Sequence, residues 1–261
     1  MTLCVAWRDK DGNVHLASDS RITVDQSTED VAVKVTRLRC EVFPPSSDLR
    51  PGAATYSLDL GIAFAGSHLN AYVIKESLVE VLSRLQYIPE ETPVSMDRIA
   101  KIAFWAYESL SKKVCAIPGL HKSGICAFFI TGYCPVKQRT RAYKLTTSAQ
   151  NVSSFSEVLH SSGDVEMLGS GEGPGKSSSH YPQDPVLTLL EVIDDTAVPS
   201  VGGAMQYARH VGTGLNVYAA WHLSDEVRYL RGGLDINEFT RSCAHDDLFI
   251  AAQIFDPRPG V

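Results

Sequence analysis

The sequence predicts an α+β sandwich built mainly on antiparallel sheet. Strand-like runs come first along the chain, two long helical patterns follow, and strand-like runs then resume. This order lacks the regular alternation of strands and helices that a parallel sheet requires. Because no repeat of fixed period and no shift in composition marks a second domain, we expect one domain over residues 1–223. A C-terminal extension over residues 224–261 would pack on this domain or on a neighbouring subunit.

Strands and helices can be placed along the whole chain in order. Four runs rich in β-branched and apolar residues open it, over residues 2–8, 13–19, 31–43 and 56–65. Apolar residues at helical spacing then predict two helices, over residues 69–85 and 95–114. The later elements are predicted as strands over residues 125–133 and 139–145, a helix over residues 186–193 and a strand over residues 215–222.

The composition of the 261 residues is typical of a folded, soluble protein. Hydrophobic residues make up 44% of the chain, which is enough for a core. The formal net charge of -6 provides no basic field to hold nucleic acid. The longest apolar runs, such as residues 126–130 and 248–254, fall far short of the roughly 20 residues that a membrane helix needs. We therefore expect no nucleic-acid partner and no membrane.

The start of the chain and its cysteines indicate a reducing compartment. The first residues form a strand-like run without a basic region, an apolar core segment or a cleavage site, so we expect a cytoplasmic protein. The six cysteines are scattered through apolar segments without a CxxC pair, which is typical of buried free thiols. The eight histidines show no spacing typical of zinc ligands. We expect no metal and no cofactor.

A tract rich in Gly and Ser, over residues 161–179, includes a near match to a phosphate loop at residues 170–177. Ser170 stands where that motif has its first glycine. Pro182 and Pro185 follow closely, whereas a phosphate loop must open a long helix whose N-terminus faces the anion. We therefore do not expect nucleotide hydrolysis.

The first two strands place polar residues beside the start of the chain. Asp11-Gly12 is a strong hairpin signal, and a two-residue turn there would pair Thr2 with Arg21. Directly paired residues share a face of the sheet. Thr2, Asp19 and Arg21 would then project to one side, with Asp19 diagonal to Thr2 at roughly 7 to 8 Å.

Thr2 can supply two catalytic groups at once if Met1 is removed, which is expected before a residue as small as threonine. The Thr2 hydroxyl would then lie beside a free α-amine, whose ordinary pKa of about 7.7 to 8.0 suits a general base at neutral pH. One residue would provide both nucleophile and base. Lys34 lies among apolar residues, so if buried it would require a charged partner such as Asp19.

These residues occur in an order that resembles a known family. Residues 2–6 before a hairpin, residues 17–21, Lys34, and residues 64–67 ahead of a long helix resemble proteasome β-type N-terminal nucleophile hydrolases. The resemblance covers roughly residues 2–222 and implies a four-layer αββα sandwich of antiparallel sheets. Within this superfamily, the long C-terminal part and residues 200–203 resemble two bacterial homologues more than they resemble HslV. These homologues are called Anbu and the beta-proteobacterial proteasome homologue, and we favour the latter.

The resemblance implies a catalytic role for each matching residue. Thr2 would be the nucleophile, and Lys34 would stabilise its oxygen as the proton leaves. Asp19 would pair with Lys34 and hold it charged and oriented. Gly66, at the end of a strand, would present its backbone N–H to the oxyanion. Attack gives an ester that water hydrolyses with the same amine as base.

Three further polar positions match the family less closely. Ser170 matches a glycine-flanked serine that hydrogen-bonds the terminal amine. Asp195 and Ser200 are candidates for the remaining acid and serine near that amine. The family has Asp-x-x-Ser-Gly-Gly, whereas here Asp195 lies five residues before Ser200 and Val201 interrupts the glycines.

The resemblance also assigns two residues to the substrate-binding region. Phe64 would shape the pocket for the side chain that precedes the scissile bond, and its bulk indicates a shallow pocket for small residues. Arg21 is expected to support the structure around the site rather than to perform chemistry. His68 and His245 are assigned to the surface or to helix caps.

Two functions follow from this reading. The first is a threonine endopeptidase that cleaves peptides or unfolded proteins inside a self-assembled ring or double ring, with any ATP-dependent unfoldase partner unidentified. The alternative is a ring-forming scaffold or binding subunit with little or no peptidase activity. A retained Met1 would favour the scaffold, because an acylated amine cannot act as a base. With one residue before Thr2, activation would need an aminopeptidase rather than self-cleavage.

Overall fold

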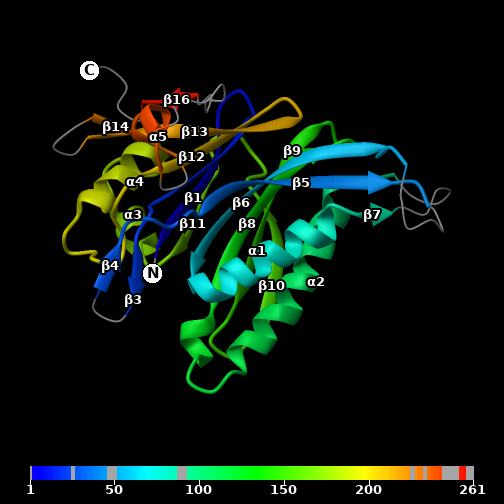
Figure 1. The fold of residues 1–261 in the computed structure, drawn as a ribbon, viewed down its shortest axis with the longest axis horizontal. Coiled ribbons are helices and arrows are strands. Elements are labelled where there is room, and N and C mark those ends of the chain that lie inside the picture. Colours follow the sequence, from blue (N-terminus) through cyan, green and yellow to red (C-terminus); the bar gives the residue numbers. More distant parts are fainter. Residues whose placement is uncertain are drawn as a thin grey trace.

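Two stacked sheets form the centre of the protein, and helices cover both outer faces (Figure 1). The computed structural model describes residues 2–24, 27–45, 52–86, 93–223, 227–231, 234–242 and 253–256. Helices α1 (His68–Leu82) and α2 (Met96–Cys115) pack on one sheet. The shorter α3 (Glu172–Ser177) and α4 (Pro185–Asp194) pack on the other. The predicted four-layer αββα sandwich is therefore confirmed.

The first sheet contains both strands of the N-terminal hairpin. Its strand order is β11 (Val165–Gly169), β1 (Leu3–Arg8), β2 (Val14–Ser18), β12 (Gln206–Val211), β13 (Gly214–Leu223), β14 (Val227–Arg231) and β15 (Leu234–Asp235). The short β16 (Ile254–Phe255) pairs in parallel with β13. The described parts of the C-terminal extension thus continue the sheet of the domain, and α5 (Ile236–Ser242) contacts β14.

The second sheet carries the long strands that lead into and out of the two large helices. Its order is β10 (Ser153–Val158), β9 (Arg139–Thr147), β8 (Cys126–Cys134), β6 (Tyr56–Gly66), β5 (Val35–Phe43) and β7 (Leu85–Gln86). A separate hairpin of β3 (Ile22–Val24) and β4 (Ser27–Glu29) precedes β5, and a 3-10 turn, η1 (His121–Gly124), precedes β8. None of the described helices is both long and apolar enough to cross a membrane.

Three apolar cores hold the four layers together. One lies between the second sheet and helices α1 and α2, one between the two sheets, and one between the first sheet and α4. Strand β6 shows how one element serves two cores. Successive side chains of a strand point to opposite faces, so Phe64 faces the helices while Ala63 and Ala65 face the other sheet.

Side-chain caps fix where the helices begin. Ser67 precedes α1, and its hydroxyl accepts a hydrogen bond from the N–H of Asn70. Asp184 does the same for α4 toward Leu187, and Pro185 occupies the first helical position, where no N–H is needed. The Ser67 cap thus starts α1 directly after Gly66, the residue whose N–H is predicted to bind the oxyanion.

The predicted register of the N-terminal hairpin is wrong by one residue. Arg8 pairs with Val14, so the turn spans five residues instead of the predicted short loop. The Asp9 carboxylate accepts a hydrogen bond from the N–H of Asn13 at 2.8 Å, and Gly12 takes a φ of +85°. This longer turn moves Asp19 opposite Leu3, whose carbonyl accepts from the N–H of Asp19 at 3.3 Å. The argument that Thr2, Asp19 and Arg21 share one face of a ladder is therefore wrong.

The predicted third strand also begins too early. Residues 31–34 lie outside β5, which starts at Val35, and the β3–β4 hairpin lies before them. Lys34 is therefore held by side-chain contacts rather than by a strand ladder. Strands β10, β11 and β12 were not predicted, and β11 with α3 occupies part of the Gly- and Ser-rich tract.

The near match to a phosphate loop serves packing in the structure. Helix α3 has only six residues. An added Cβ at Gly171 would lie 2.7 Å from the Cβ of Leu3, and one at Gly175 would lie 2.8 Å from the Sδ of Met167. The two glycines therefore allow α3 to pack closely on β1 and β11.

Candidate active site

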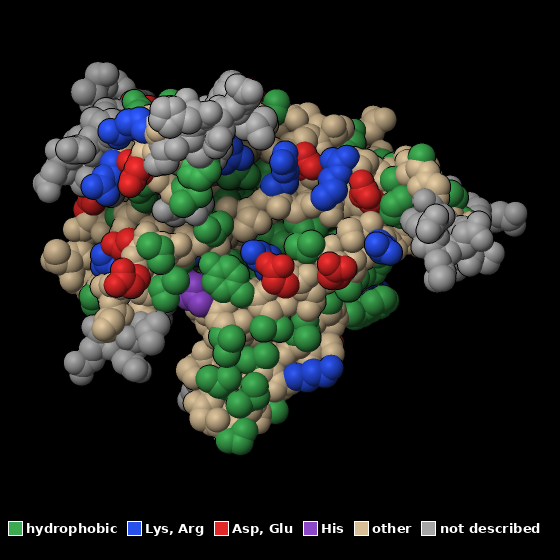
Figure 2. All heavy atoms as spheres, viewed as in Figure 1, with side chains coloured by type: hydrophobic (Ala, Val, Ile, Leu, Met, Phe, Trp, Pro, Cys, Tyr) green, Lys and Arg blue, Asp and Glu red, His purple; other side chains and the backbone are tan. Residues whose placement is uncertain are grey.

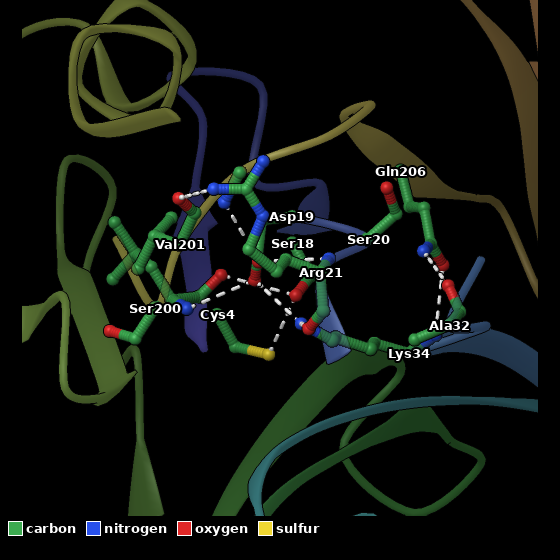
Figure 3. Close-up of polar contacts among 12 residues, drawn as sticks. Cys4, Ser18, Asp19, Ser20, Arg21, Ala32, Lys34, Ser200, Val201 and Gln206 are labelled. Carbon is green, nitrogen blue, oxygen red and sulfur yellow. Dashed lines mark hydrogen bonds and ion pairs between the residues drawn. The ribbon is translucent and has the colours of Figure 1, made fainter. Parts of the chain in front are cut away.

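Two of the predicted catalytic residues, Asp19 and Lys34, meet where β1 begins and β2 ends (Figure 3). Asp19 follows β2 directly, and Lys34 directly precedes β5. The segment over residues 199–203 approaches from the C-terminal half of the chain, between α4 and β12. Four stretches that are distant in sequence thus converge at the N-terminus.

Asp19 is the centre of this convergence. Its side chain is fully buried and accepts four hydrogen bonds. Oδ1 accepts from the Lys34 ammonium at 2.9 Å and from the N–H of Leu3 at 3.1 Å. Oδ2 accepts from the N–H of Arg21 at 3.1 Å and from the N–H of Gly202 at 3.2 Å. One carboxylate therefore ties β1, the end of β2 and the segment before β12 to the lysine.

Lys34 forms an ion pair with Asp19 in which both side chains are 0% exposed. Its ammonium also donates to the carbonyl of Arg21 at 2.7 Å. Burial lowers the pKa of Lys34 and raises the pKa of Asp19, while the attraction between the two opposes both shifts. Each of the two residues therefore depends on the other to stay charged in this buried position.

Thr2 is placed by its backbone beside this pair. The N–H of the next residue, Leu3, donates to Asp19, and the carbonyl of Thr2 accepts from the N–H of Gly171 at 3.3 Å. Gly169 has a φ of +103°, and a Cβ there would lie only 2.0 Å from the Thr2 carbonyl oxygen. A glycine at position 169 is thus required for Thr2 to be seated against β11.

Gly66 lies where β6 ends and α1 begins. Its φ is +100°, and an added Cβ would lie 2.5 Å from the carbonyl oxygen of Ile125. The same carbonyl accepts a hydrogen bond from the N–H of Ser67 at 2.8 Å. Both the backbone angle and the close approach therefore require glycine. The oxyanion role of its N–H stays a prediction.

Arg21 supports the segment over residues 199–202. Its guanidinium binds Asp30 through two hydrogen bonds, of 2.8 and 3.1 Å, and also donates to the carbonyls of Pro199 and Val201. A Cβ on Gly202 would fall 2.3 Å from the guanidinium carbon. These contacts join Arg21 to the segment before β12, and its supporting role stays a prediction.

The structure brings Ser170 and Ser200 together but not Asp195. The hydroxyls of Ser170 and Ser200 lie 3.0 Å apart. Asp195 is exposed at the end of α4, and its carboxylate accepts from the N–H of Ala197 at 2.8 Å. Its side-chain hydrogen bond thus closes a local turn, in keeping with the altered spacing of the motif.

The side chain of Phe64, predicted to shape the substrate pocket, is buried in the core, and its pocket role stays a prediction. The ring is 0% exposed, and its neighbours in the core are Phe128, Tyr72 and His68, with ring centroids 5.6 to 5.7 Å away. The alternation along β6 turns this side chain toward α1, away from the other sheet. Phe64 therefore belongs to the core beneath the start of α1.

Two residues near the site were missed by the sequence analysis. The thiol of Cys4 donates to the carbonyl of Phe64 at 2.8 Å, and burial raises its pKa to about 12, so it remains neutral. Gln206 hydrogen-bonds the backbone of Lys34 from a distance of 172 residues in sequence. The pairing of β12 with β2 brings Gln206 close to Lys34, and the sequence alone does not predict this pairing.

His68, assigned above to the surface or a helix cap, is the first residue of α1 and is half-buried. Among the described residues its Nε2 is buried without a hydrogen-bond partner. Burial, and then the positive charge of Lys34, lowers the pKa of His68 to about 4. A neutral imidazole therefore adjoins the site at physiological pH. His245 lies outside the described residues.

Comparisons with known proteins agree on the fold. No protein-family model matches the chain, and no curated protein matches its sequence. Among solved structures, the Anbu (Gly-1) mutant from Hyphomicrobium sp. strain MC1 aligns with a TM-score of 0.56 at 15% identity, over 96% of this chain and 99% of that chain. The helical assembly of the Anbu complex from Pseudomonas aeruginosa aligns with a TM-score of 0.55 at 15% identity, over 83% and 86%.

Anbu (ancestral beta-subunit) from Yersinia bercovieri gives a TM-score of 0.52 at 14% identity, over 80% of this chain and 82% of that chain. At such low identity these likenesses show the fold alone. The resemblance to bacterial proteasome-like proteins stated from the sequence is therefore confirmed at the level of the fold.

Proposed function

We propose that the chain is a threonine peptidase whose nucleophile is Thr2 after removal of Met1. The observation that carries the proposal is the fully buried ion pair of Lys34 and Asp19, which is hydrogen-bonded to the residue directly after Thr2. Burying two charges costs free energy that apolar packing would not. A lysine kept at that cost beside a second-position threonine is best explained by chemistry.

In the proposed reaction the Thr2 hydroxyl attacks the carbonyl carbon of a peptide bond. The α-amine of Thr2 accepts the hydroxyl proton, directly or through water. The Lys34 ammonium, held by Asp19, stabilises the negative charge on the threonine oxygen during the transfer. The backbone N–H of Gly66 would donate to the oxyanion of the tetrahedral intermediate.

Collapse of that intermediate breaks the C–N bond. The leaving amine takes the proton from the Thr2 ammonium, and the acyl group remains as an ester on the threonine oxygen. Water then attacks the ester with the same α-amine as base, which releases a carboxylate and restores the hydroxyl. One peptide bond and one water are consumed, and one amine and one carboxylate are formed.

Self-assembly is part of the proposal. One solved structure with this fold is described as a helical assembly. Figure 2 shows hydrophobic side chains gathered over α1 and over the C-terminal end of α2, toward the bottom of the view. Leu69 and Val73 of α1 and Trp105 of α2 are exposed by 58%, 38% and 58%. An assembly that covers such residues and encloses the sites would restrict access to peptides and unfolded chains.

Intact-mass spectrometry with a β-lactone that acylates N-terminal threonine tests the proposal. We expect wild-type protein to lack Met1 and to gain one probe mass per chain. Thr2→Ala should also lose Met1 but gain no probe, whereas Thr2→Ser should still be labelled because it keeps a hydroxyl. Protein from its native host that keeps Met1 and takes no probe would favour the scaffold instead.

A further inference from the structure

We infer that Gln206 is a positioning residue for Lys34, an inference that rests on the proposed function. Gln206 is the first residue of β12 and pairs with Ser18, next to Asp19 in the chain. It is 8% exposed, and its side chain points to the stretch that carries Lys34 (Figure 3).

The Gln206 amide makes three hydrogen bonds to the backbone of residues 32–35. Its Oε1 accepts from the N–H of Lys34 at 2.9 Å and from the N–H of Val35 at 3.1 Å. Its Nε2 donates to the carbonyl of Ala32. One side chain thus fixes the backbone on both sides of the Lys34 Cα.

This stretch lacks the support of a strand ladder. Strand β5 begins only at Val35, and residues 31–34 precede it. The N–H of Ala32 donates to the carbonyl of Ser20 at 2.9 Å, and the N–H of Val33 donates to the Tyr72 hydroxyl at 3.3 Å. At Lys34 itself the backbone N–H is held by Gln206. The Gln206 amide therefore fixes the backbone from which the Lys34 side chain reaches Asp19 and the Arg21 carbonyl.

The chemistry of the contact selects glutamine. Two N–H groups and one carbonyl face the same point, so the side chain must offer an acceptor and a donor at its end. A carboxamide offers both, a carboxylate offers only acceptors, and a thioether offers neither in useful strength. Methionine at position 206 would keep the length of the side chain but lose all three bonds.

Displacement of Lys34 has a chemical signature. A nearby ammonium lowers the pKa of the Thr2 α-amine, because two positive charges repel. If Lys34 moves away, that pKa rises and the amine becomes a free base only at higher pH. A catalytic group misplaced by about 1 Å can reduce the rate by about 100-fold. Both effects should follow the loss of Gln206.

The test measures the rate of β-lactone labelling against pH in protein that begins at Thr2. We expect Gln206→Met to be labelled roughly 10- to 100-fold more slowly than wild type, with the acidic limb of its pH profile shifted upward. The shift should have the same direction as in Lys34→Ala. Gln206→Glu should recover part of the rate, because it keeps an acceptor for the two N–H groups.

Thr131→Val is the matched control. Its hydroxyl is also fully buried and hydrogen-bonded, to the Gly61 carbonyl and to His210, but it lies further along the second sheet. We expect this variant to lose stability yet keep the labelling rate and the pH profile. Equal slowing in Thr131→Val and Gln206→Met, with no pH shift in either, would reduce Gln206 to a structural role.

Hydrogen exchange of a peptide covering residues 32–35 tests the contact independently of activity. Faster exchange in Gln206→Met than in wild type is expected, because the amides of Lys34 and Val35 lose their acceptor. If wild type and Gln206→Met are labelled at the same rate and with the same pH profile, the positioning role of Gln206 is overturned while the proposed function stands. If wild type takes no label, the proposed function is overturned. Unchanged hydrogen exchange in Gln206→Met would overturn the contact between Gln206 and residues 32–35.

Discussion

At the scale of single residues, the site is organised by Asp19 rather than by the threonine it serves. The carboxylate accepts from one ammonium and from three backbone N–H groups that belong to three different stretches of chain. Burial raises the pKa of Asp19, and these donors oppose that rise because they stabilise the charged form. Loss of any partner leaves charge uncompensated in the core, so the pair and the local fold depend on each other.

Lys34→Met tests this dependence. The variant leaves the Asp19 charge buried without its cation, so we expect the free energy of unfolding to fall by about 3–5 kcal/mol. Urea unfolding monitored by circular dichroism measures the change.

The double variant Lys34→Met with Asp19→Asn is the internal control for that experiment. It removes both charges while an amide keeps most of the volume, so we expect it to be more stable than Lys34→Met alone. Additive losses from the two substitutions would show that the pair is not coupled, contrary to the geometry.

The residues of the site differ in how far the sequence predicts them. Lys34 could be paired with Asp19 because a lysine among valines, if buried, requires a counter-charge. Gln206 could not be found, because nothing in its neighbourhood marks it and its partners are about 170 residues away. The contacts of Phe64 could not be predicted, because a motif gives a position in the chain, whereas the face of the strand decides what the side chain touches.

At the scale of elements, the junction between β6 and α1 depends on Gly66. Gly66→Ala should impose both an unfavourable φ and a clash with the Ile125 carbonyl. We expect a loss of about 1–2 kcal/mol from the backbone angle and a further ~1–3 kcal/mol from the clash. Thermal unfolding of the variants measures the sum.

Two other glycines separate these contributions. Gly119 has a φ of +89° with nothing within 4 Å, so Gly119→Ala should show only the cost of the backbone angle. Gly52 has open space and no positive φ, so Gly52→Ala should have almost no effect. A Gly66→Ala variant as stable as Gly119→Ala would mean that the junction relaxes without cost.

Elements with a clear apolar pattern could be predicted, and elements without one could not. Predicted helices at 69–85 and 95–114 correspond to α1 at His68–Leu82 and α2 at Met96–Cys115, and the strand at 56–65 corresponds to β6. Strand β10 was missed because it is rich in serine and alternates between exposed and half-buried positions. The hairpin register was missed because the Asp9 side chain stabilises a longer turn than Asp11-Gly12 alone would form.

The C-terminal extension also makes a prediction at this scale. Strand β13 pairs with β14 and β16, and Phe255 stacks on Tyr207 with ring centroids 3.9 Å apart. A chain ending at residue 223 would expose the edge of β13, so we expect a lower melting temperature and aggregation in light scattering. Phe255→Ala is the milder variant, with an expected loss of at least about 1 kcal/mol. Full stability of the shortened chain would show that residues 1–223 suffice.

At the scale of the whole molecule, apolar contacts between the two sheets are accompanied by polar links, and the contact between His210 and Thr131 is a buried one that can titrate. His210 on β12 is 1% exposed, and its Nε2 lies 2.9 Å from the hydroxyl of Thr131 on β8. Burial lowers the pKa of His210 to about 4. The imidazole is therefore neutral between the sheets, and protonating it would place a charge in the core.

The pH dependence of stability follows from this link. Between pH 6.5 and about 4 the unfolded chain binds a proton at His210 and the folded chain does not. His210 should therefore make the free energy of unfolding fall with pH in this window, by about 1.4 kcal/mol per pH unit and by roughly 3 kcal/mol in all, in addition to the fall caused by His68, whose pKa is also lowered to about 4. Urea unfolding at pH 7, 6, 5 and 4 measures the slope. His210→Gln keeps a polar group near Thr131 but cannot be protonated, so its slope should be shallower by that amount. Equal slopes in wild type and His210→Gln would show that His210 does not couple the packing of the two sheets to pH.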